Sequence, residues 1–205
     1  MATASKAALR EQLLAARSRV ADAVRATEAR MLGEQLEALV GEQTSSGSTI
    51  CAYVPVKTEP GAIEMLDMLV RRSARVLLPV ARTGAEDVPL PLRWGEYRPG
   101  ALTRGRWGLL EPPEPWLPSS ALAEAGLVLV PALAVDRTGV RLGRGRGFYD
   151  RSLSNRDPRA WLIAMVRDEE LADELPADPH DVPMTHALMP RRGVIALSPT
   201  SHGRG

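Results

Sequence analysis

The sequence predicts an α/β domain in which one sheet lies between two covering layers. From residue 49 onward, short apolar runs alternate with helical patterns, and each run is apolar at consecutive positions rather than at every second one. Strands buried on both faces have this pattern, which is typical of a mostly parallel or mixed sheet flanked by helices. A length of 205 residues suits one such three-layer unit. We therefore expect a single domain over residues 1–205.

Two amphipathic helices are expected within residues 5–40, ahead of an α/β core at 49–200. Ser5 is a suitable N-cap for the first helix, which carries Leu9 and Leu13 on one face. The second helix is predicted to end near Gly41, because glycine commonly terminates helices. Residues 41–48 are polar and contain glycine, so a loop is predicted there.

The core is predicted to contain buried strands at 49–54, 75–80, 127–131, 161–166 and 193–197, with a helix at 62–72. Between the second and third of these strands lies a segment rich in Pro and Gly, residues 83–119. It contains Trp94, Trp107 and Trp116. A linker rarely carries so many large apolar side chains, so we expect short strands and turns folded onto the core.

The composition excludes several classes of protein. The longest apolar run, 127–135, is interrupted by Pro131 and falls short of the roughly 20 residues of a membrane helix. The N-terminus lacks the apolar stretch of a signal peptide, and the one cysteine, Cys51, fits a reducing cytoplasm. Arginine makes up 24 of the 26 basic residues, which a codon bias explains for most of them, and 25 acidic residues balance the charge. No large positive field is therefore available for nucleic acid.

The most informative segment follows the predicted strand 127–131 and runs DRTGVRLGRGRGFYDRSL over residues 136–153. Glycines and arginines alternate in it, at Gly143, Arg144, Gly145, Arg146 and Gly147. Backbone N–H groups of such a loop can converge on an anion, and guanidinium groups can bind phosphate oxygens. A helix beginning near Asp150 would add the positive end of its dipole. Walker A and G-x-G-x-x-G patterns are absent, and a solvated surface turn is the alternative interpretation.

Residues 130–151, VPALAVDRTGVRLGRGRGFYDR, resemble the signature of the 5-formyltetrahydrofolate cyclo-ligase family, also called methenyltetrahydrofolate synthetases. Other landmarks of that family occur in order along nearly the whole chain: Lys6-x-x-x-Arg10, Glu59 in YVPVKTEP, Gly108 to Pro112, and His180-Asp181. The chain departs from the family pattern twice. Phe148 stands where Tyr is usual, and Thr185 stands where a second Asp is frequent, which leaves Asp181 as the better metal ligand.

The resemblance implies a NagB/RpiA/CoA transferase-like fold and a reaction that uses ATP and Mg²⁺. In that reaction 5-formyltetrahydrofolate becomes 5,10-methenyltetrahydrofolate, and ADP and phosphate are released. The activating step is phosphoryl transfer to the formyl oxygen, which depends chiefly on positioning and charge neutralisation. N10 of the folate then closes the ring.

The resemblance also implies roles for individual residues. ATP would be bound by Lys6, Arg10, Arg141, Gly143, Arg144, Gly145, Arg146, Gly147 and Tyr149. The folate substrate would be bound by Arg10, Val54, Glu59, Arg144, Gly147 and Phe148. Mg²⁺ would be held by Asp150 and Asp181. Arg144, Arg146 and Tyr149 would act in catalysis.

Two other classes of function remain open from the residues alone. One is an ATP-independent enzyme of a related fold, such as a phosphosugar isomerase or a CoA transferase. The other is an RNA-binding module that uses the arginine-rich loop, although few aromatic residues are present to stack bases. The partner we expect is a small-molecule folate, with or without a polyglutamate tail. We expect a monomer that binds neither nucleic acid nor a membrane.

Overall fold

The computed structural model describes residues 5–45, 47–72, 74–179 and 181–198. His180, half of the C-terminal landmark, lies outside these residues, whereas Asp181 lies within them. In the part of the chain that is described, no helix combines the length and the apolar character needed to cross a bilayer.

Within the described residues, the largest sheet has seven strands in the order β12-β11-β9-β6-β1-β2-β3. The inner strands are parallel, and the two edge strands run antiparallel to their neighbours. The bounds are β1 Thr49–Cys51, β2 Arg75–Val80, β3 Arg93–Glu96, β6 Ala125–Pro131, β9 Trp161–Met165, β11 His186–Met189 and β12 Gly193–Ala196. The predicted mostly parallel sheet is confirmed, and β11 is a strand that the sequence analysis missed.

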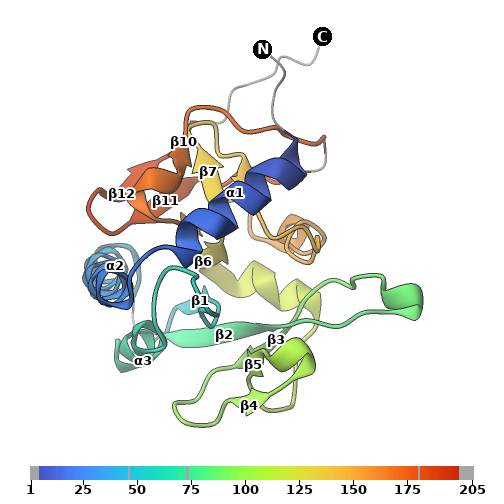
Figure 1. Cartoon of the computed structure of the whole chain (residues 1–205). Helices are drawn as coiled ribbons and strands as arrows, with labels where there is room; N and C mark the ends of the chain where they lie inside the picture. The colour runs from blue at the N-terminus through green and yellow to red at the C-terminus, as the bar shows by residue number, and fades with distance from the viewer. Residues whose placement is uncertain (1–4, 46, 73, 180, 199–205) are drawn as a thin grey trace.

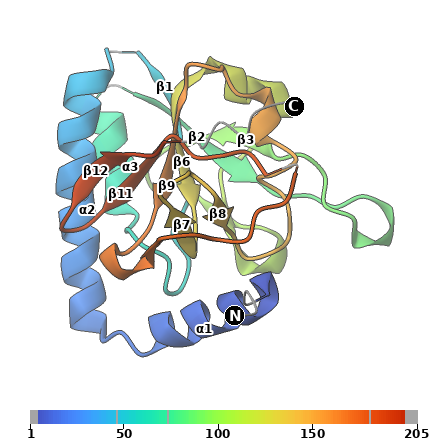
Figure 2. The same ribbon diagram turned by 90° about the horizontal axis from the view of Figure 1, so that it is seen from above.

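Helices α2 (Asp22–Gln43) and α3 (Glu64–Arg71) cover one face of this sheet, as Figures 1 and 2 show. Buried leucines of both helices, among them Leu36 and Leu66, pack in one core with strand residues such as Leu129. The neighbouring strand residues point to the opposite face, because side chains alternate along a strand. The face covered by α2 and α3 therefore holds about half of the apolar core.

The opposite face is covered by 3-10 turns and loops instead of long helices. The turns η3 (Ser119–Glu124) and η4 (Leu153–Asn155) bury Leu122 and Leu153 in a second core with strand residues such as Val128. The sheet thus lies between two covering layers, and α-helices form one of them.

Helix α1 (Lys6–Ser18) lies across the carboxyl end of the sheet rather than on either face (Figures 1 and 2). The Ser5 hydroxyl accepts a hydrogen bond from the N–H of Ala8 at 3.2 Å, which confirms the predicted N-cap. Leu9 and Leu13 pack on a small sheet formed by β7 (Ala134–Asp136), β8 (Arg141–Leu142) and β10 (Leu171–Ala172). This packing brings the basic face of α1 to the strand ends.

Most differences from the predicted elements lie at their ends. Helix α2 continues to Gln43, so Gly41 does not terminate it. Strand β1 ends at Cys51 rather than at 54, because the chain then leaves the sheet and forms a loop at its carboxyl end. Segment 83–119 folds as predicted into short strands and turns, among them β4 (Thr103–Arg104) and β5 (Leu110–Glu111).

Candidate active site

A cavity of about 790 Å³ lies at the carboxyl ends of the inner strands. Strand β1 is followed in the chain by β2 on one side, whereas β6 lies on its other side. In open α/β sheets, ligand crevices form where the connections diverge in this way. The loops that follow β1 and β6 form two walls of the cavity, and residues 141–150 and the β4-β5 hairpin form the others.

The cavity brings together most of the residues that the sequence analysis singled out. Those that line it are Val54, Glu59, Arg141, Gly143, Arg144, Gly145, Arg146, Gly147, Phe148, Tyr149 and Asp150. Three predicted residues, Lys6, Arg10 and Asp181, do not line it.

The glycine-arginine loop takes its shape from two glycines in the left-handed region, Gly145 at φ +92° and Gly147 at φ +73°. Other residues rarely adopt such angles. The predicted helix near Asp150 is wrong, because turns lead from the loop to the three-residue η4. The Ser152 hydroxyl donates to the carbonyl of Phe148 at 2.7 Å and accepts from a distant backbone N–H, and such side-chain bonds compete with helix formation. Residues 148–152 form turns, so no helix begins at the end of the loop, and arginines and backbone N–H groups carry its positive charge.

Arg141 and Asp150 form an ion pair in the cavity wall, with 2.6 Å between the guanidinium and the carboxylate. A second nitrogen of Arg141 donates to the carbonyl of Pro131, at the end of β6, at 3.3 Å. Arg141 Nε and the hydroxyl of Tyr149 are buried and have no partner within the described residues. Burial, with the charge of Glu59, raises the pKa of Tyr149, against the opposing effect of Arg141. Tyr149 is therefore a hydrogen-bond donor rather than a base at neutral pH.

Arg144 and Glu59 form a second ion pair, with 2.8 Å between Nε and Oε1. The Glu59 side chain is 9% exposed and that of Arg144 is 40% exposed, so the carboxylate belongs to the wall and the guanidinium to the opening. The other carboxylate oxygen accepts from the N–H of Val56 at 3.1 Å, which fixes its orientation. Glu59 thus presents a rigid acceptor to the cavity.

The sequence analysis assigned no ligand role to Trp107, which closes one side of the cavity from the β4-β5 hairpin. Two guanidinium groups lie over its ring, that of Arg106 at 5.0 Å and that of Arg146 at 4.6 Å from the centroid. The ring of Phe148 is 5.8 Å away at 55°. Together with Arg146, these two rings form an aromatic and cationic wall, which fits a flat heterocycle.

Arg10 and Lys6 act from outside the cavity wall. Arg10 donates from Nε to the carbonyl of Gly143 at 2.9 Å, and a Cβ at Gly145 would lie 3.3 Å from its guanidinium, so Arg10 supports the loop from behind. Lys6 pairs with Asp178 at 2.6 Å and with Asp181 at 2.8 Å. Burial lowers the pKa of Lys6, but hydrogen bonds to these two carboxylates outweigh it and raise the pKa overall.

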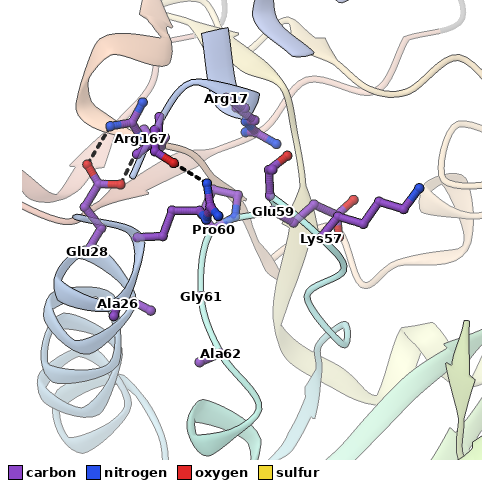
Figure 3. A pocket seen from close by; sticks show the side chains of 13 residues that line it. Arg17, Ala26, Glu28, Lys57, Glu59, Pro60, Gly61, Ala62 and Arg167 are labelled. Carbon is purple, nitrogen blue, oxygen red and sulfur yellow. Dashed lines mark hydrogen bonds and ion pairs between the residues drawn. The ribbon is translucent and has the colours of Figure 1, made fainter. Parts of the chain in front are cut away.

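A second cavity, of about 210 Å³, adjoins the first and shares Arg17, Lys57 and Glu59 with it (Figure 3). Arg17 is 1% exposed and was missed by the sequence analysis. Its position in the sequence could have indicated a role. Arg17 follows Arg10 by seven residues, which is about two helical turns, so the two arginines share one face of the helix. An arginine on the buried face of a helix indicates a specific partner.

The chemistry of the cavity fits a polyphosphate and one divalent cation. Arginine nitrogens and the two left-handed glycines supply donors for phosphate oxygens, and the buried Nε of Arg141 and hydroxyl of Tyr149 still need acceptors. The described residues contain no cluster of three or more His, Cys, Asp or Glu that would hold a metal alone. Mg²⁺ commonly binds one or two carboxylates together with substrate phosphates. Asp150 lines the cavity and would supply such a carboxylate on leaving its ion pair with Arg141, whereas Asp181 pairs with Lys6 and does not line the cavity.

Comparison with known proteins agrees with the geometry. A model of the family described as 5-formyltetrahydrofolate cyclo-ligase matches residues 2–190. The 5-formyltetrahydrofolate cyclo-ligase of Mycolicibacterium smegmatis is 56% identical over 96% of this chain and 100% of its own length. The enzyme of the same name in Escherichia coli K12 is 27% identical over 70% of this chain and 79% of its own.

Two solved structures share the fold. The NMR structure of the Aquifex aeolicus 5,10-methenyltetrahydrofolate synthetase has a TM-score of 0.71 at 22% identity, covering 98% of this chain and 95% of its own. A 5,10-methenyltetrahydrofolate synthetase from Mycoplasma pneumoniae has a TM-score of 0.67 at 19% identity, covering 88% and 96%. Identities this low concern the fold alone.

Proposed function

The chain belongs to the 5-formyltetrahydrofolate cyclo-ligase family and is an enzyme of that type, and from this premise we propose how its cavity performs the reaction. The substrates are 5-formyltetrahydrofolate and ATP with Mg²⁺, and the products are 5,10-methenyltetrahydrofolate, ADP and phosphate. The arrangement of Arg144, Arg141 and Asp150 around one cavity at the strand switch point carries this proposal. It combines phosphate donors and a metal ligand with a buried acceptor for a heterocycle.

The reaction must activate a formamide, whose carbonyl carbon is a weak electrophile and whose oxygen is a poor leaving group. In the proposed sequence, the formyl oxygen forms a bond to the γ-phosphorus of ATP, and the bond to the bridging oxygen breaks to release ADP. N10 of the folate then bonds to the activated carbon and loses its proton. Phosphate leaves with the former formyl oxygen, which completes the five-membered ring.

Arg144 and Arg146, at the opening of the cavity, would neutralise the charge on the transferred phosphoryl group. Gly145 and Gly147 would direct backbone N–H groups at the triphosphate, while Arg10 supports the loop through the carbonyl of Gly143. When bound, Mg²⁺ would neutralise phosphate charge, and Asp150 would hold it. Lys6 and Asp181 would join the site only if their ion pair opens, so their predicted roles remain proposals.

The folate would lie between Glu59 and the aromatic wall. Glu59 would accept hydrogen bonds from N–H groups of the pterin, while Phe148 and Val54 would contact its faces. Tyr149 would donate its buried hydroxyl to a substrate oxygen rather than remove a proton. The replacement of the usual Tyr by Phe148 keeps a ring for stacking and removes one hydroxyl.

Absorbance of the methenyl product in the near ultraviolet tests the proposal. Purified protein with 5-formyltetrahydrofolate, ATP and Mg²⁺ should generate this product, and omission of ATP or chelation of Mg²⁺ should stop it. Product formed without ATP would instead support an ATP-independent mechanism. RNA binding stronger than ATP binding would support the loop as an RNA site.

The oligomeric state, the partners and the location of the enzyme are also proposals. We infer a monomer that acts on small folates in the cytoplasm, without nucleic acid or membrane as partner. The single cysteine supports a reducing compartment, since Cys51 is a buried free thiol. Mass measurement in solution by light scattering would test the monomer.

A further inference from the structure

Arg17 occupies an unusual position for a charged residue, since both it and its partner Glu170 are buried, at 1% and 5% exposure. Nε and one terminal nitrogen of Arg17 donate to the two carboxylate oxygens of Glu170, each at 2.7 Å. The same terminal nitrogen donates to the carbonyl of Ala132 at 2.6 Å. Burial of two charges is costly unless geometry of this quality compensates for it. The pair therefore has a specific structural task.

The ion pair lies where the C-terminal end of α1 contacts the segment that follows β6. Ala132 directly follows β6 and lines the main cavity, and the preceding carbonyl, that of Pro131, accepts from Arg141. Glu170 also accepts from the N–H of Arg167 at 2.8 Å, which fixes the carboxylate. Arg17 thus ties the C-terminal turn of α1 to the cavity wall through two rigid acceptors.

The second cavity leaves the C-terminal end of α1 with few packing contacts, so the ion pair of Arg17 is needed to hold it. Figure 3 shows Arg17 at its edge, near Glu59, and its lining includes few large apolar side chains. A cavity provides no packing atoms, so apolar contacts do not hold α1 on this side. The third guanidinium nitrogen of Arg17 has no partner within the described residues. Orientation of the helix end therefore depends on the ion pair.

Arg10 lies two turns before Arg17 on the same face of α1 and holds the glycine-arginine loop through the carbonyl of Gly143. A rotation of α1 would move this guanidinium away from Gly143 and Gly145. Catalytic sites are sensitive to displacements of about 1 Å in their supporting groups. The ion pair of Arg17 is thus connected to the loop through one helix and one side chain.

We propose that Arg17 is a positioning residue for the nucleotide site, which it serves through Arg10. Its ion pair with Glu170 orients α1 so that Arg10 holds the loop in the shape that binds the triphosphate. The inference rests on the proposed function, because the loop is a nucleotide site only there. It adds to that function a residue of α1 that lies outside the glycine-arginine loop.

The test compares Glu170→Gln with Glu28→Gln. Glu28 forms a bidentate ion pair with Arg167, at 2.7 and 2.8 Å, that does not involve α1 (Figure 3). Both variants should lose thermal stability. The Kd of a non-hydrolysable ATP analogue, measured by calorimetry, should rise about five- to tenfold in Glu170→Gln and less than twofold in Glu28→Gln. The KM for the folate should change little in either variant.

A double-mutant cycle with Arg10→Ala separates positioning from a general loss of structure. If Arg17 acts through Arg10, adding Glu170→Gln to Arg10→Ala should leave the Kd unchanged within about twofold. Equal losses in both backgrounds would overturn the inference and leave the proposed function intact. Wild-type protein that binds no ATP analogue would overturn the proposed function itself.

A second variant covers the case in which Glu170→Gln does not fold. Arg17→Lys keeps the charge but offers one donor group in place of the bidentate fork. It should fold and show an intermediate Kd, and the effect should again disappear in the Arg10→Ala background. A nucleotide affinity equal to that of the wild type would overturn the inference.

Discussion

Arg144 donates to Glu59 across 2.8 Å, although the two residues are 85 positions apart, and Arg144 is proposed to meet the transferred phosphoryl group while Glu59 is proposed to bind the pterin. The contact joins Arg144 Nε to Glu59 Oε1, so each group has one fewer site for a ligand while the pair is formed. Binding of either substrate would therefore release a group for the other. Mutual release of this kind predicts positive coupling between the nucleotide and the folate.

Glu59→Gln should have opposite effects on the two substrates. The folate KM should rise about 10- to 100-fold, because a hydrogen bond to a charged acceptor is weakened. Nucleotide affinity without folate should rise by up to about fivefold, since a partly exposed ion pair contributes at most about 1 kcal/mol. Calorimetry and steady-state kinetics measure the two effects.

The control for this variant is Glu124→Gln, which removes a surface ion pair with Arg75 outside the cavity. Neither affinity should change in the control. Weaker nucleotide binding in Glu59→Gln would contradict competition between the ion pair and the phosphate.

Asp150→Asn should weaken the binding of Mg²⁺ rather than the fold. The neutral amide is a poorer ligand for Mg²⁺, so the Mg²⁺ concentration for half-maximal rate should rise about tenfold or more at fixed ATP. A titration of Mg²⁺ against the initial rate measures this. Asp157→Asn, which removes an exposed pair with Arg159, is the matched control. An unchanged Mg²⁺ requirement in Asp150→Asn would remove this residue from the metal site.

Gly145→Ala should reduce activity more than stability. A side chain at φ +92° costs about 1–2 kcal/mol, and the added methyl would press on Arg10 at 3.3 Å. We expect at least a tenfold loss in kcat/KM for ATP with a modest fall in Tm. Gly41→Ala in helix α2 meets nothing within 4 Å and should raise Tm without affecting rate, since alanine favours helices. Equal activity of the two variants would contradict the prediction that activity depends on the left-handed conformation of Gly145.

His186 makes stability depend on pH. Its ring stacks on Trp161 at 3.8 Å, and burial lowers its pKa below the ordinary value of 6.5. The unfolded chain then binds a proton more readily than the folded one, so the free energy of unfolding falls as pH falls through the unfolded value. Between about pH 8 and pH 5.5, Tm should fall more for the wild type than for His186→Gln. Parallel falls would show that His186 does not contribute.

The sequence anticipated those parts of the fold that depend on local patterns. Strand β2 occurs with the predicted bounds, because a short apolar run in a parallel sheet is recognisable without its neighbours. The helix expected near Asp150 was wrong because the Ser152 hydroxyl donates to a backbone carbonyl and accepts from the N–H of Leu92, which is 60 positions away and precedes β3. Such a contact has no local signal.

The same distinction applies to the site. The alternation of glycine and arginine in residues 143–147 predicted an anion-binding loop from residue chemistry alone, and family motifs named its substrates as a proposal. Arg17 and Trp107 escaped notice as ligand-site residues because a buried ion pair and a cation–π wall exist only after distant segments pack.

By itself, the sequence determined much of the order of elements, the mostly parallel sheet and the chemical character of the loop, since apolar periodicity and residue type act over short stretches. Only the tertiary structure decided that Glu59 meets Arg144, that Lys6 holds Asp181, and that Arg17 anchors α1 through Glu170. The physical reason is that charge pairing depends on distance in space, which local sequence does not encode. The cavity joins residues from both categories at one switch point of the sheet.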